Sequence, residues 1–264
     1  MSGIQNQNWQ KKTEEFEQIK EGSPSLVFTS GLQRRLELAQ KYVSFRGKTI
    51  LDIGCGIGIF LREFEKLTKK ESIFGIETDD KKVKIAKKNY FNVIKGTAED
   101  VPFKDNFFDI IWLHEVIEHV IDDKKTIEES MRVLKEEGYI IIFAPNRLWP
   151  IETHGIYFES KYYFGNIPLV TWLPNFLYKK LTPHVRNYSN KSIEALFKDL
   201  NVRIILHSHI FPGFSKIEKK SPFLGKITQK IFYFFEKTPF HNFGLSHFLI
   251  IQKIHIKGGR VGLR

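Results

Sequence analysis

The sequence contains one cysteine, Cys55, and two methionines among its 264 residues. A single cysteine excludes a disulfide bond within the chain and is typical of a reducing compartment. No uninterrupted apolar run reaches the roughly 18 residues that a membrane-spanning helix needs. The polar first twenty residues also lack the apolar core of a signal peptide. These absences predict a cytoplasmic, globular protein.

Acidic residues are scarce in the second part of the chain. Residues 1–145 hold 23 lysines and arginines against 24 aspartates and glutamates, whereas residues 146–264 hold 18 against 6. This imbalance accounts for the whole net charge of +11. A basic half favours an anionic partner, namely nucleic acid, an acidic lipid surface or a phosphorylated substrate. The alternative is that the lysines only solvate a surface.

Apolar strand-like runs alternate with helical patterns from residue 46 onwards. The predicted strands cover residues 48–54, 72–77, 91–96, 107–114, 139–145, 202–210 and 245–256. The predicted helices cover residues 57–67, 79–90, 122–138, 189–200 and 221–237, in addition to helices within the first 45 residues. Alternation of this kind predicts an α/β fold with a parallel sheet covered on both faces.

The run ILDIGCGIG, residues 50–58, changes from a buried strand to alternating glycines. Glycines at these positions give up side-chain packing, so the pattern predicts a ligand that approaches the main chain closely. Glu77 ends the next predicted strand, and its carboxylate suits the two hydroxyls of a ribose. Dinucleotide-binding proteins have G-x-G-x-x-G at this place. Here the glycines recur in steps of two.

The pattern Asp-x-Gly-x-Gly-x-Gly resembles motif I of the class I S-adenosylmethionine-dependent methyltransferases. The resemblance extends over three further blocks, which are GIETD (75–79), GTAEDVPFKDNFFDIIWLHEVIEHV (96–120) and MRVLKEEGYIIIFAPN (131–146). The chain is most similar to the type found in ubiquinone and menaquinone biosynthesis. The resemblance implies a Rossmann-like, mostly parallel sheet of seven strands, with helices on both faces and an aromatic-rich insertion after the fifth strand.

The family implies S-adenosylmethionine as the cofactor. Its methionine part would lie against the glycine turn, Asp52 would orient the turn or reach the amino group through water, and Glu77 would bind the ribose. Thr97 stands where relatives usually have an aspartate that accepts from the adenine amino group, so adenine contacts fall to Thr97, Ala98, Glu99 or Asp100. The cofactor-binding residues implied in this way are Asp52, Gly54, Gly56, Gly58, Glu77, Thr97, Ala98, Glu99 and His114.

These patterns divide the chain into five segments. They are an N-terminal helical segment (1–45), the cofactor-binding half of the sheet domain (46–145), an acceptor-site insertion rich in aromatic residues and prolines (146–188), the C-terminal half of the domain (189–256) and a tail (257–264). Because the insertion follows the fifth strand, we expect it to cover the site and to select the methyl acceptor.

Two histidines are candidates for catalysis. His154, in the insertion, is the candidate general base, and His114 follows the fourth strand where relatives line the methionine end of the cofactor. An ordinary packing role is the alternative for each histidine of the insertion. The candidate substrate-binding residues are Arg147, Glu152, His184, Arg186 and Tyr188.

The motif EVIEH offers a further interpretation. On a helix, Glu115, Glu118 and His119 would share a face, and the same triplet is associated with magnesium in related ubiquinone O-methyltransferases. Similar sequences are common in the family without a metal. We therefore expect no metal site and favour a packing or capping role for His119.

The predicted helix at 221–237 is amphipathic and basic. Its apolar face comprises Leu224, Ile227, Ile231, Phe234 and Phe235, and its lysines are Lys226, Lys230 and Lys237. The favoured interpretation is that the apolar face packs against the sheet or the insertion, and the alternative is a membrane interface. The 24 phenylalanines, mixed with lysines, favour an apolar, quinone-like or lipid-linked acceptor that is methylated at oxygen.

Two other functions fit parts of the sequence. An RNA methyltransferase would use the basic half to hold phosphates, but the chain lacks an Asn/Asp-Pro-Pro-Tyr motif and a recognisable RNA-binding module. A non-catalytic binding protein on the cofactor fold is the second alternative. The intact glycines and Glu77 argue against a loss of cofactor binding.

Overall fold

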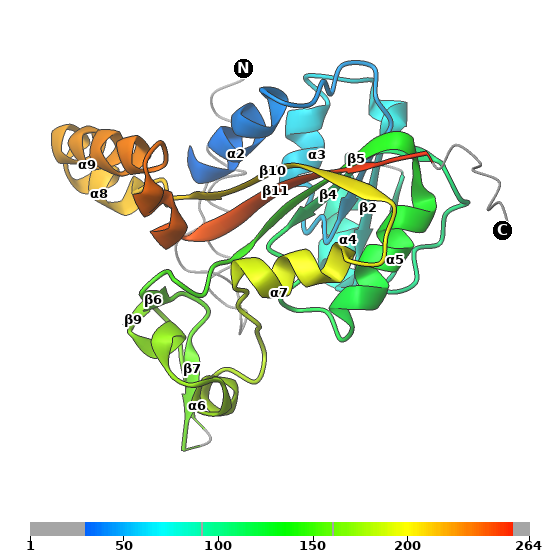
Figure 1. The fold of residues 1–264 in the computed structure, drawn as a ribbon. Coiled ribbons are helices and arrows are strands. Elements are labelled where there is room, and N and C mark those ends of the chain that lie inside the picture. The colour runs from blue at the N-terminus through cyan, green and yellow to red at the C-terminus, as the bar shows by residue number, and fades with distance from the viewer. Residues whose placement is uncertain (1–29, 91, 160, 256–264) are drawn as a thin grey trace, which may run out of the picture. The chain divides into compact units, whose positions relative to one another are not determined.

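The computed structural model describes residues 30–90, 92–159 and 161–255 (Figure 1). The predictions for residues 1–29 and for the tail at 257–264 lie outside the described residues. The chain forms two compact units. Unit 1 takes the chain up to Tyr42 together with Phe143–Ser189 and Ser208–Phe248, and unit 2 takes Val43–Ile142, Asn190–His207 and the chain from Leu249.

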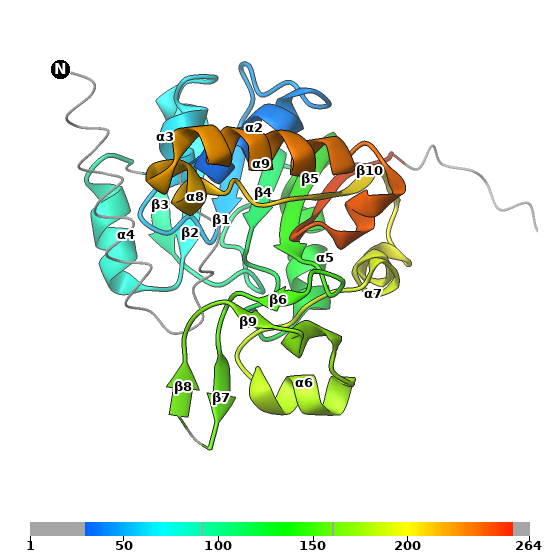
Figure 2. The same ribbon diagram turned by 90° about the vertical axis from the view of Figure 1, so that its left-hand side faces the viewer.

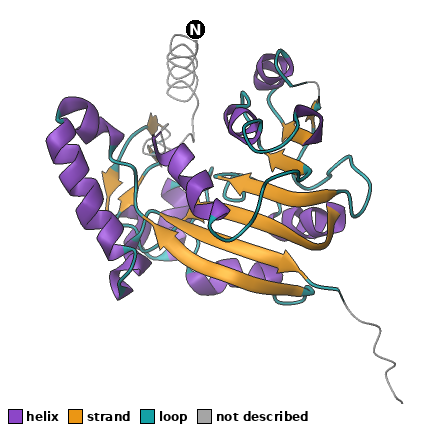
Figure 3. Ribbon diagram, turned by 90° about the horizontal axis from the view of Figure 1, so that it is seen from above, coloured by secondary structure: helices purple, strands orange, loops and turns teal. Residues whose placement is uncertain are grey.

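A seven-stranded sheet runs through the fold, as predicted, and is flanked by helices (Figure 3). Strand β1 pairs in parallel with β2 and β4, and β2 pairs in parallel with β3. In spatial order the strands are β10 (Val202–Ile210), β11 (Ser246–Lys253), β5 (Leu134–Pro145), β4 (Phe108–His114), β1 (Ile50–Ile53), β2 (Ile73–Glu77) and β3 (Val93–Lys95). The strand order therefore reverses between β1 and β4, where sheets of this kind bind their ligands.

In unit 2, α-helices follow β1, β2 and β4, whereas β3 leads to β4 without one. They are α3 (Ile59–Phe64), α4 (Asp80–Lys87) and α5 (Asp123–Val133), and unit 2 also holds α7 (Asn190–Glu194). Side chains cap two of them, because Asp79 accepts from the backbone N–H of Lys81 at 2.8 Å and Asp122 accepts from that of Lys125 at 2.9 Å. Aromatic rings fill part of the core, with Phe60 and Trp112 at a centroid distance of 4.9 Å.

The predicted helix at 122–138 is wrong at its C-terminal end. Helix α5 ends at Val133, and the buried Leu134 already has extended backbone, so β5 begins there. Gly138 lies within β5, where an added Cβ would meet the carbonyl oxygens of Lys135 and Asp109 at 2.9 and 3.0 Å. This glycine allows two backbone segments to approach and does not end a helix. The predicted helix at 189–200 is also shorter, because α7 gives way to a 3₁₀ helix at Ala195–Phe197.

Unit 1 contains the predicted insertion. Figure 2 shows its small strands and α6 (Asn175–Leu181) together. Its strands pair antiparallel in two ladders, β6 (Ile151–Glu152) with β9 (Ile167–Pro168) and β7 (Ile156–Phe158) with β8 (Lys161–Tyr163). Unit 1 also contains the helices α2 (Ser30–Gln40), α8 (Ser215–Lys220) and α9 (Pro222–Phe235) and 3₁₀ helices at Val170–Trp172 and Pro239–Phe243. Unit 2 contains a further 3₁₀ helix at Lys70–Ser72. Among the described residues, no helix is long and apolar enough to cross a membrane.

Helix α9 contradicts the favoured interpretation of its sequence. Its only buried residue is Gly225. Leu224, Ile227, Ile231 and Phe234 are exposed, and Phe235 is half-buried. The apolar face therefore does not pack against the sheet or the insertion.

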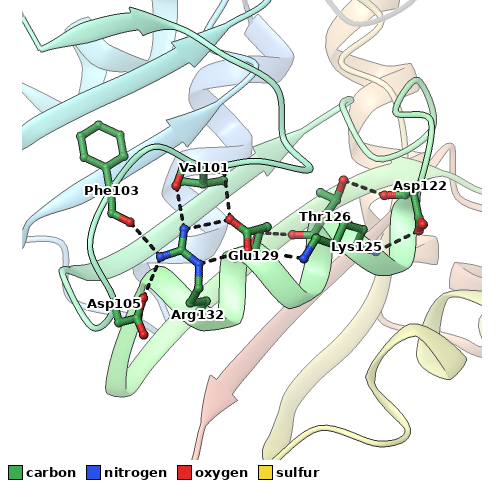
Figure 4. A network of polar contacts seen from close by, with 9 residues as sticks. Val101, Phe103, Asp105, Asp122, Lys125, Thr126, Glu129 and Arg132 are labelled. Carbon is green, nitrogen blue, oxygen red and sulfur yellow. Dashed lines mark hydrogen bonds and ion pairs between the residues drawn. The ribbon is translucent and has the colours of Figure 1, made fainter.

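An ion-pair network fixes the segment after β3 to α5 (Figure 4). Arg132 donates through Nε and Nη2 to the two carboxylate oxygens of Glu129, at 3.0 and 2.8 Å. The same guanidinium donates to the carbonyl oxygens of Val101 and Phe103, at 2.7 and 2.8 Å, and to Asp105 at 2.7 Å. Glu129 also accepts from the backbone N–H of Val101 at 3.0 Å. One side chain thus satisfies backbone groups along 101–105.

We expect Arg132→Ala to lower the free energy of unfolding by about 1–3 kcal/mol, because it leaves buried acceptors unpaired. Lys125→Ala is the matched control. Its side chain is half exposed and 3.7 Å from Glu129, so the expected change is within about 0.5 kcal/mol. Chemical denaturation of both variants measures these values, and equal effects would contradict the role of the network.

The hydrogen bonds and charge of Arg132 lower the pKa of Glu129, against the effect of burial. A carboxyl whose pKa is lower in the folded chain stabilises the fold above its ordinary pKa, and this contribution is lost as the pH falls through the folded value. The difference in the free energy of unfolding between the wild type and Arg132→Ala should therefore become smaller below about pH 4.5.

Candidate cofactor and acceptor sites

The glycine turn after β1 has the backbone that only glycine adopts without strain. Gly54, Gly56 and Gly58 have φ values of 72°, 57° and 90°, in the left-handed region. A Cβ on Gly54 would lie 2.5 Å from Cγ2 of Val116, whereas a Cβ on Gly56 would meet nothing within 4 Å. Gly54 is therefore required by packing. Gly56 leaves open space beside the main chain, as expected where a ligand approaches.

Strand β2 holds this turn in place. The carbonyl oxygen of Ile76 accepts from the backbone N–H groups of Gly54 and Cys55 at 2.8 and 3.0 Å. The next residue, Glu77, accepts from the Gly56 N–H through Oε2 at 3.0 Å. Its Oε1 accepts from the N–H groups of Thr78 and Asp79, both at 2.9 Å. Glu77 is thus a buried carboxylate fixed at the edge of the turn.

Asp52 is a second buried carboxylate at this end of the sheet. Its side chain is 2% exposed, and its Oδ2 has no hydrogen-bond partner. Burial, and then the charge of Glu77, raises the pKa of Asp52 well above its ordinary value. A buried polar atom without a partner is costly and uncommon in a native structure. Oδ2 of Asp52 therefore suits a ligand with a positively charged or hydrogen-bond-donating group.

Cys55 explains another glycine of the motif. A Cβ on Gly75 would lie 2.7 Å from Sγ of Cys55, so the buried thiol occupies the space of a side chain on β2. Burial raises the pKa of the thiol, and the negative charges of Asp52 and Glu77 add to this effect. Since the thiolate is the reactive form of cysteine, Cys55 has a packing role.

The remaining candidates for cofactor binding follow β3 and β4. Thr97 is exposed and Ala98 is buried, directly after β3. Glu99 accepts from the backbone N–H groups of Ile121 and Asp122 at 2.7 and 3.4 Å, which ties it to the segment before α5. His114 ends β4, half-buried, with its ring centroid 4.8 Å from that of Phe60. Parallel pairing in unit 2 brings the ends of these strands to the same edge as Glu77.

The EVIEH motif is not helical. Residues 115–119 form a bend and a turn, and Glu115 has a φ of 53°. A left-handed conformation costs a non-glycine residue about 1 kcal/mol or more. Glu118 is buried, and its Oε1 is 3.9 Å from Nε2 of the exposed His119. The helical face on which the metal interpretation depended is absent.

Glu152 and His154 form a buried pair in unit 1. Oε1 of Glu152 accepts from the backbone N–H of His154 at 2.8 Å and lies 3.2 Å from Nδ1 of its ring. Oε2 accepts from the hydroxyl of Tyr178 at 2.9 Å. Burial opposes ionisation, but these hydrogen bonds and the charge of His154 hold the pKa of Glu152 below its ordinary value. An ionised Glu152 only accepts hydrogen bonds, so Nδ1 of His154 carries the proton between them.

Of the other insertion candidates, His184 contacts this pair. Nε2 of His184 lies 3.2 Å from the backbone oxygen of His154, and the hydroxyl of Tyr162 donates to the same oxygen. Arg147 donates to the carbonyl oxygen of Leu173 at 2.8 Å. The further candidates, Arg186 and Tyr188, are half-buried and buried, respectively, and the backbone of Tyr188 bonds with that of Arg147 and with His247.

A family model of known proteins matches part of the chain. Residues 51–142, which contain the glycine turn, Glu77 and His114, match the family described as a methyltransferase domain. This part of the chain is therefore similar to methyltransferase domains. The cofactor that this family and fold imply is S-adenosylmethionine.

Two relatives match parts of the chain. An uncharacterised protein of Methanocaldococcus jannaschii is 40% identical over 92 residues, which are 35% of this chain and 42% of that protein. A ubiquinone biosynthesis O-methyltransferase of Bartonella bacilliformis is 29% identical over 136 residues, covering 49% of this chain and 51% of the relative. The chain spans about half of each of these relatives.

Solved structures share the fold. An S-adenosylmethionine-dependent methyltransferase from Mesorhizobium loti superposes with a TM-score of 0.56 at 12% identity, covering 83% of this chain and 96% of that one. The YcgJ protein of Bacillus subtilis gives a TM-score of 0.52 at 20% identity, covering 85% and 100%. The predicted Rossmann-like fold is confirmed.

The sequence left two structural partners of these sites unidentified. Val116, whose side chain lies against Gly54, is part of the EVIEH motif after β4, but that motif directed attention to its glutamates and histidine. Tyr178, which binds Glu152, is one of many aromatic residues in the insertion. Glu152 was expected to contact substrate, and its two oxygens contact His154 and Tyr178. Neither partnership has a signal in the spacing of the residues.

We expect Asp52→Asn to raise the stability of the cofactor-free chain at pH 7 by on the order of 1–3 kcal/mol. The raised pKa means that the folded chain binds a proton at Asp52 more tightly than the unfolded chain does. The wild type therefore loses stability as the pH rises through the pKa of Asp52 in the folded chain. The gain in stability of the variant over the wild type should shrink toward pH 4. Thermal unfolding against pH measures this, with the exposed Asp100→Asn as control. A gain in stability that grows at low pH would contradict a raised pKa of Asp52.

Proposed function

We propose that the protein transfers a methyl group from S-adenosylmethionine to an oxygen of a small apolar, quinone-like or lipid-linked acceptor. The observation that carries the methyl-transfer proposal is the open left-handed turn at Gly56, bounded by the fixed carboxylate of Glu77 and the unpartnered Oδ2 of Asp52. The family match over residues 51–142 supports it.

The residues present fit this cofactor. Glu77 would bind the ribose through Oε2, because a carboxylate oxygen has two lone pairs and Gly56 N–H uses one of these, whereas Oε1 already accepts from Thr78 and Asp79. Oδ2 of Asp52 would receive the positively charged amino group, directly or through water, which would offset the burial of its charge. Thr97, Ala98 and Glu99 are the candidates for the adenine, and His114 for the methionine end. When bound, S-adenosylmethionine supplies a sulfonium-activated methyl group.

An alcohol or phenol acceptor needs a group that takes its proton. His154 is our candidate, because the ionised Glu152 binds Nδ1–H and so fixes the tautomer in which Nε2 is the basic nitrogen. Glu152 would act as a positioning residue that also stabilises the protonated imidazole. Arg147, His184, Arg186 and Tyr188 remain candidates for substrate contact.

The acceptor class is supported by the insertion surface. Its exposed apolar and aromatic side chains are Leu148, Phe158, Tyr163, Phe164, Leu169, Trp172, Phe176 and Leu177. A surface of this kind suits an apolar molecule better than a sugar or a free nucleotide. The name of the Bartonella relative adds support for an oxygen acceptor of the quinone type.

Gly56→Arg should abolish binding of S-adenosylmethionine, weakening it by about 100-fold or more, because the new side chain would enter the space beside the turn. Gly47→Arg is the matched control, since Gly47 also has a left-handed φ, 70°, and nothing within 4 Å of an added Cβ. Calorimetric titration of the full chain measures both. Equal affinity of the two variants would refute the cofactor site.

His154→Gln should lower kcat by about 100-fold or more while leaving the Kd for S-adenosylmethionine unchanged, because it removes the base and not the cofactor site. Glu152→Gln should act in the same direction, and Tyr178→Phe should act less because it keeps the pair with His154. The readout is transfer of labelled methyl groups into lipid and quinone extracts, with RNA as a parallel acceptor. Labelling of RNA alone would favour the RNA methyltransferase.

A further inference from the structure

Helix α9 turns its most apolar side to solvent. Five side chains are exposed by 39–72% and define what we call the α9 face: Phe223, Leu224, Ile227, Ile231 and Phe234. At 100° per residue they fall within an arc of about 100°. Phe240, in the following 3₁₀ helix, is also exposed. Exposed apolar residues that gather on one helix face mark an interaction site more often than scattered ones do.

The opposite side of α9 already packs. A Cβ on Gly225 would lie 2.5 Å from Cα of Glu218, so α8 and α9 are in close contact there (Figure 2). Gln229 donates to the carbonyl oxygen of Gly213 at 2.7 Å, and Glu236 accepts from the N–H of Phe211 at 2.9 Å. The ring of Phe232 lies 5.1 Å from that of Phe211. Rotating the α9 face inward would break all of these contacts, so its exposure is built into the fold.

Lysines flank the α9 face. Lys226, Lys230 and Lys237 are all exposed and fall along one edge of the apolar arc at 100° per residue. They belong to the part of the chain, residues 146–264, in which basic residues outnumber acidic ones by 18 to 6. Aromatic and aliphatic residues beside a row of lysines are the composition of helices that lie in a membrane interface.

We propose that the α9 face docks on an anionic lipid bilayer, with its phenylalanines in the acyl boundary and its lysines at the headgroups. A bilayer offers both an apolar layer and negative charge, which matches the two halves of this surface. RNA would satisfy the lysines and leave the apolar arc exposed. A second copy of the chain would cover the arc and bring rows of lysines together. The inference does not depend on methyl transfer.

Sedimentation of the full chain with vesicles tests the proposal. We expect binding to vesicles of phosphatidylglycerol and phosphatidylcholine, weak binding to phosphatidylcholine alone, and a loss of binding at high salt. Lys226→Gln/Lys230→Gln/Lys237→Gln should weaken binding to the anionic vesicles by about 100-fold. Phe223→Ser/Phe234→Ser should weaken it by a similar factor.

Phe176→Ser is the matched control, because Phe176 on α6 is 73% exposed and lies outside the α9 face. Since all of these side chains are exposed, the variants should unfold at the temperature of the wild type. Failure of the wild type to sediment with anionic vesicles would overturn the proposal, and so would equal effects of the Phe176 and α9-face variants. A dimer in sedimentation velocity that is lost in Phe223→Ser/Phe234→Ser, without vesicle binding, would identify a second copy as the occupant.

A fluorescent reporter tests which part of the chain enters the bilayer. The emission of Ile231→Trp should shift to shorter wavelength on anionic vesicles and be quenched by brominated lipid. That of Phe176→Trp should not. The reverse pattern would assign membrane contact to the insertion and overturn the role of α9. Calorimetry with S-adenosylmethionine on the same samples separates this outcome from a failure of the proposed function.

Discussion

Parallel pairing of β1 with β2 is the constraint on which the cofactor site depends. Register places Ile53 opposite Ile76, so the chain leaves β1 beside the last residues of β2. Ile76 then accepts two N–H groups of the glycine turn, and Glu77 accepts a third. Left-handed φ values at Gly54, Gly56 and Gly58 allow these bonds to form within five residues. The turn and the carboxylate that bounds it are therefore fixed together.

This arrangement places the carboxyl groups of Asp52 and Glu77 near each other, and Oδ2 of Asp52 has no hydrogen-bond partner. Asp52 is fully enclosed near Glu77, and its pKa is raised for that reason. In unit 1, by contrast, the buried Glu152 is compensated by His154 and Tyr178. Buried carboxylates that lack partners destabilise a fold, and they persist at functional sites where a ligand supplies the missing partner. The two buried carboxylates therefore differ in their surroundings: Glu152 orients a histidine, and Asp52 is our candidate for binding the amino group of the cofactor.

The sequence predicts local features well and contacts of distant residues poorly. Strand and helix alternation, the glycine turn and Glu77 all follow from spacing or residue type within a few positions. The end of α5 was missed, because the extended backbone from Leu134 depends on β5 and not on helix propensity. Helix α9 was expected to bury its apolar side and exposes it. Both errors arise because the periodicity of apolar residues does not show which elements pack against them.

A crystal structure of the full chain with S-adenosylhomocysteine tests the central claim most directly. The account predicts that the ribose hydroxyls bond to Glu77, that the amino-acid end follows the main chain at Gly56, and that Oδ2 of Asp52 gains a partner there. Density for the ligand elsewhere, or a ligand at the turn that leaves Glu77 and Asp52 without contact to it or to its bound waters, would contradict the account.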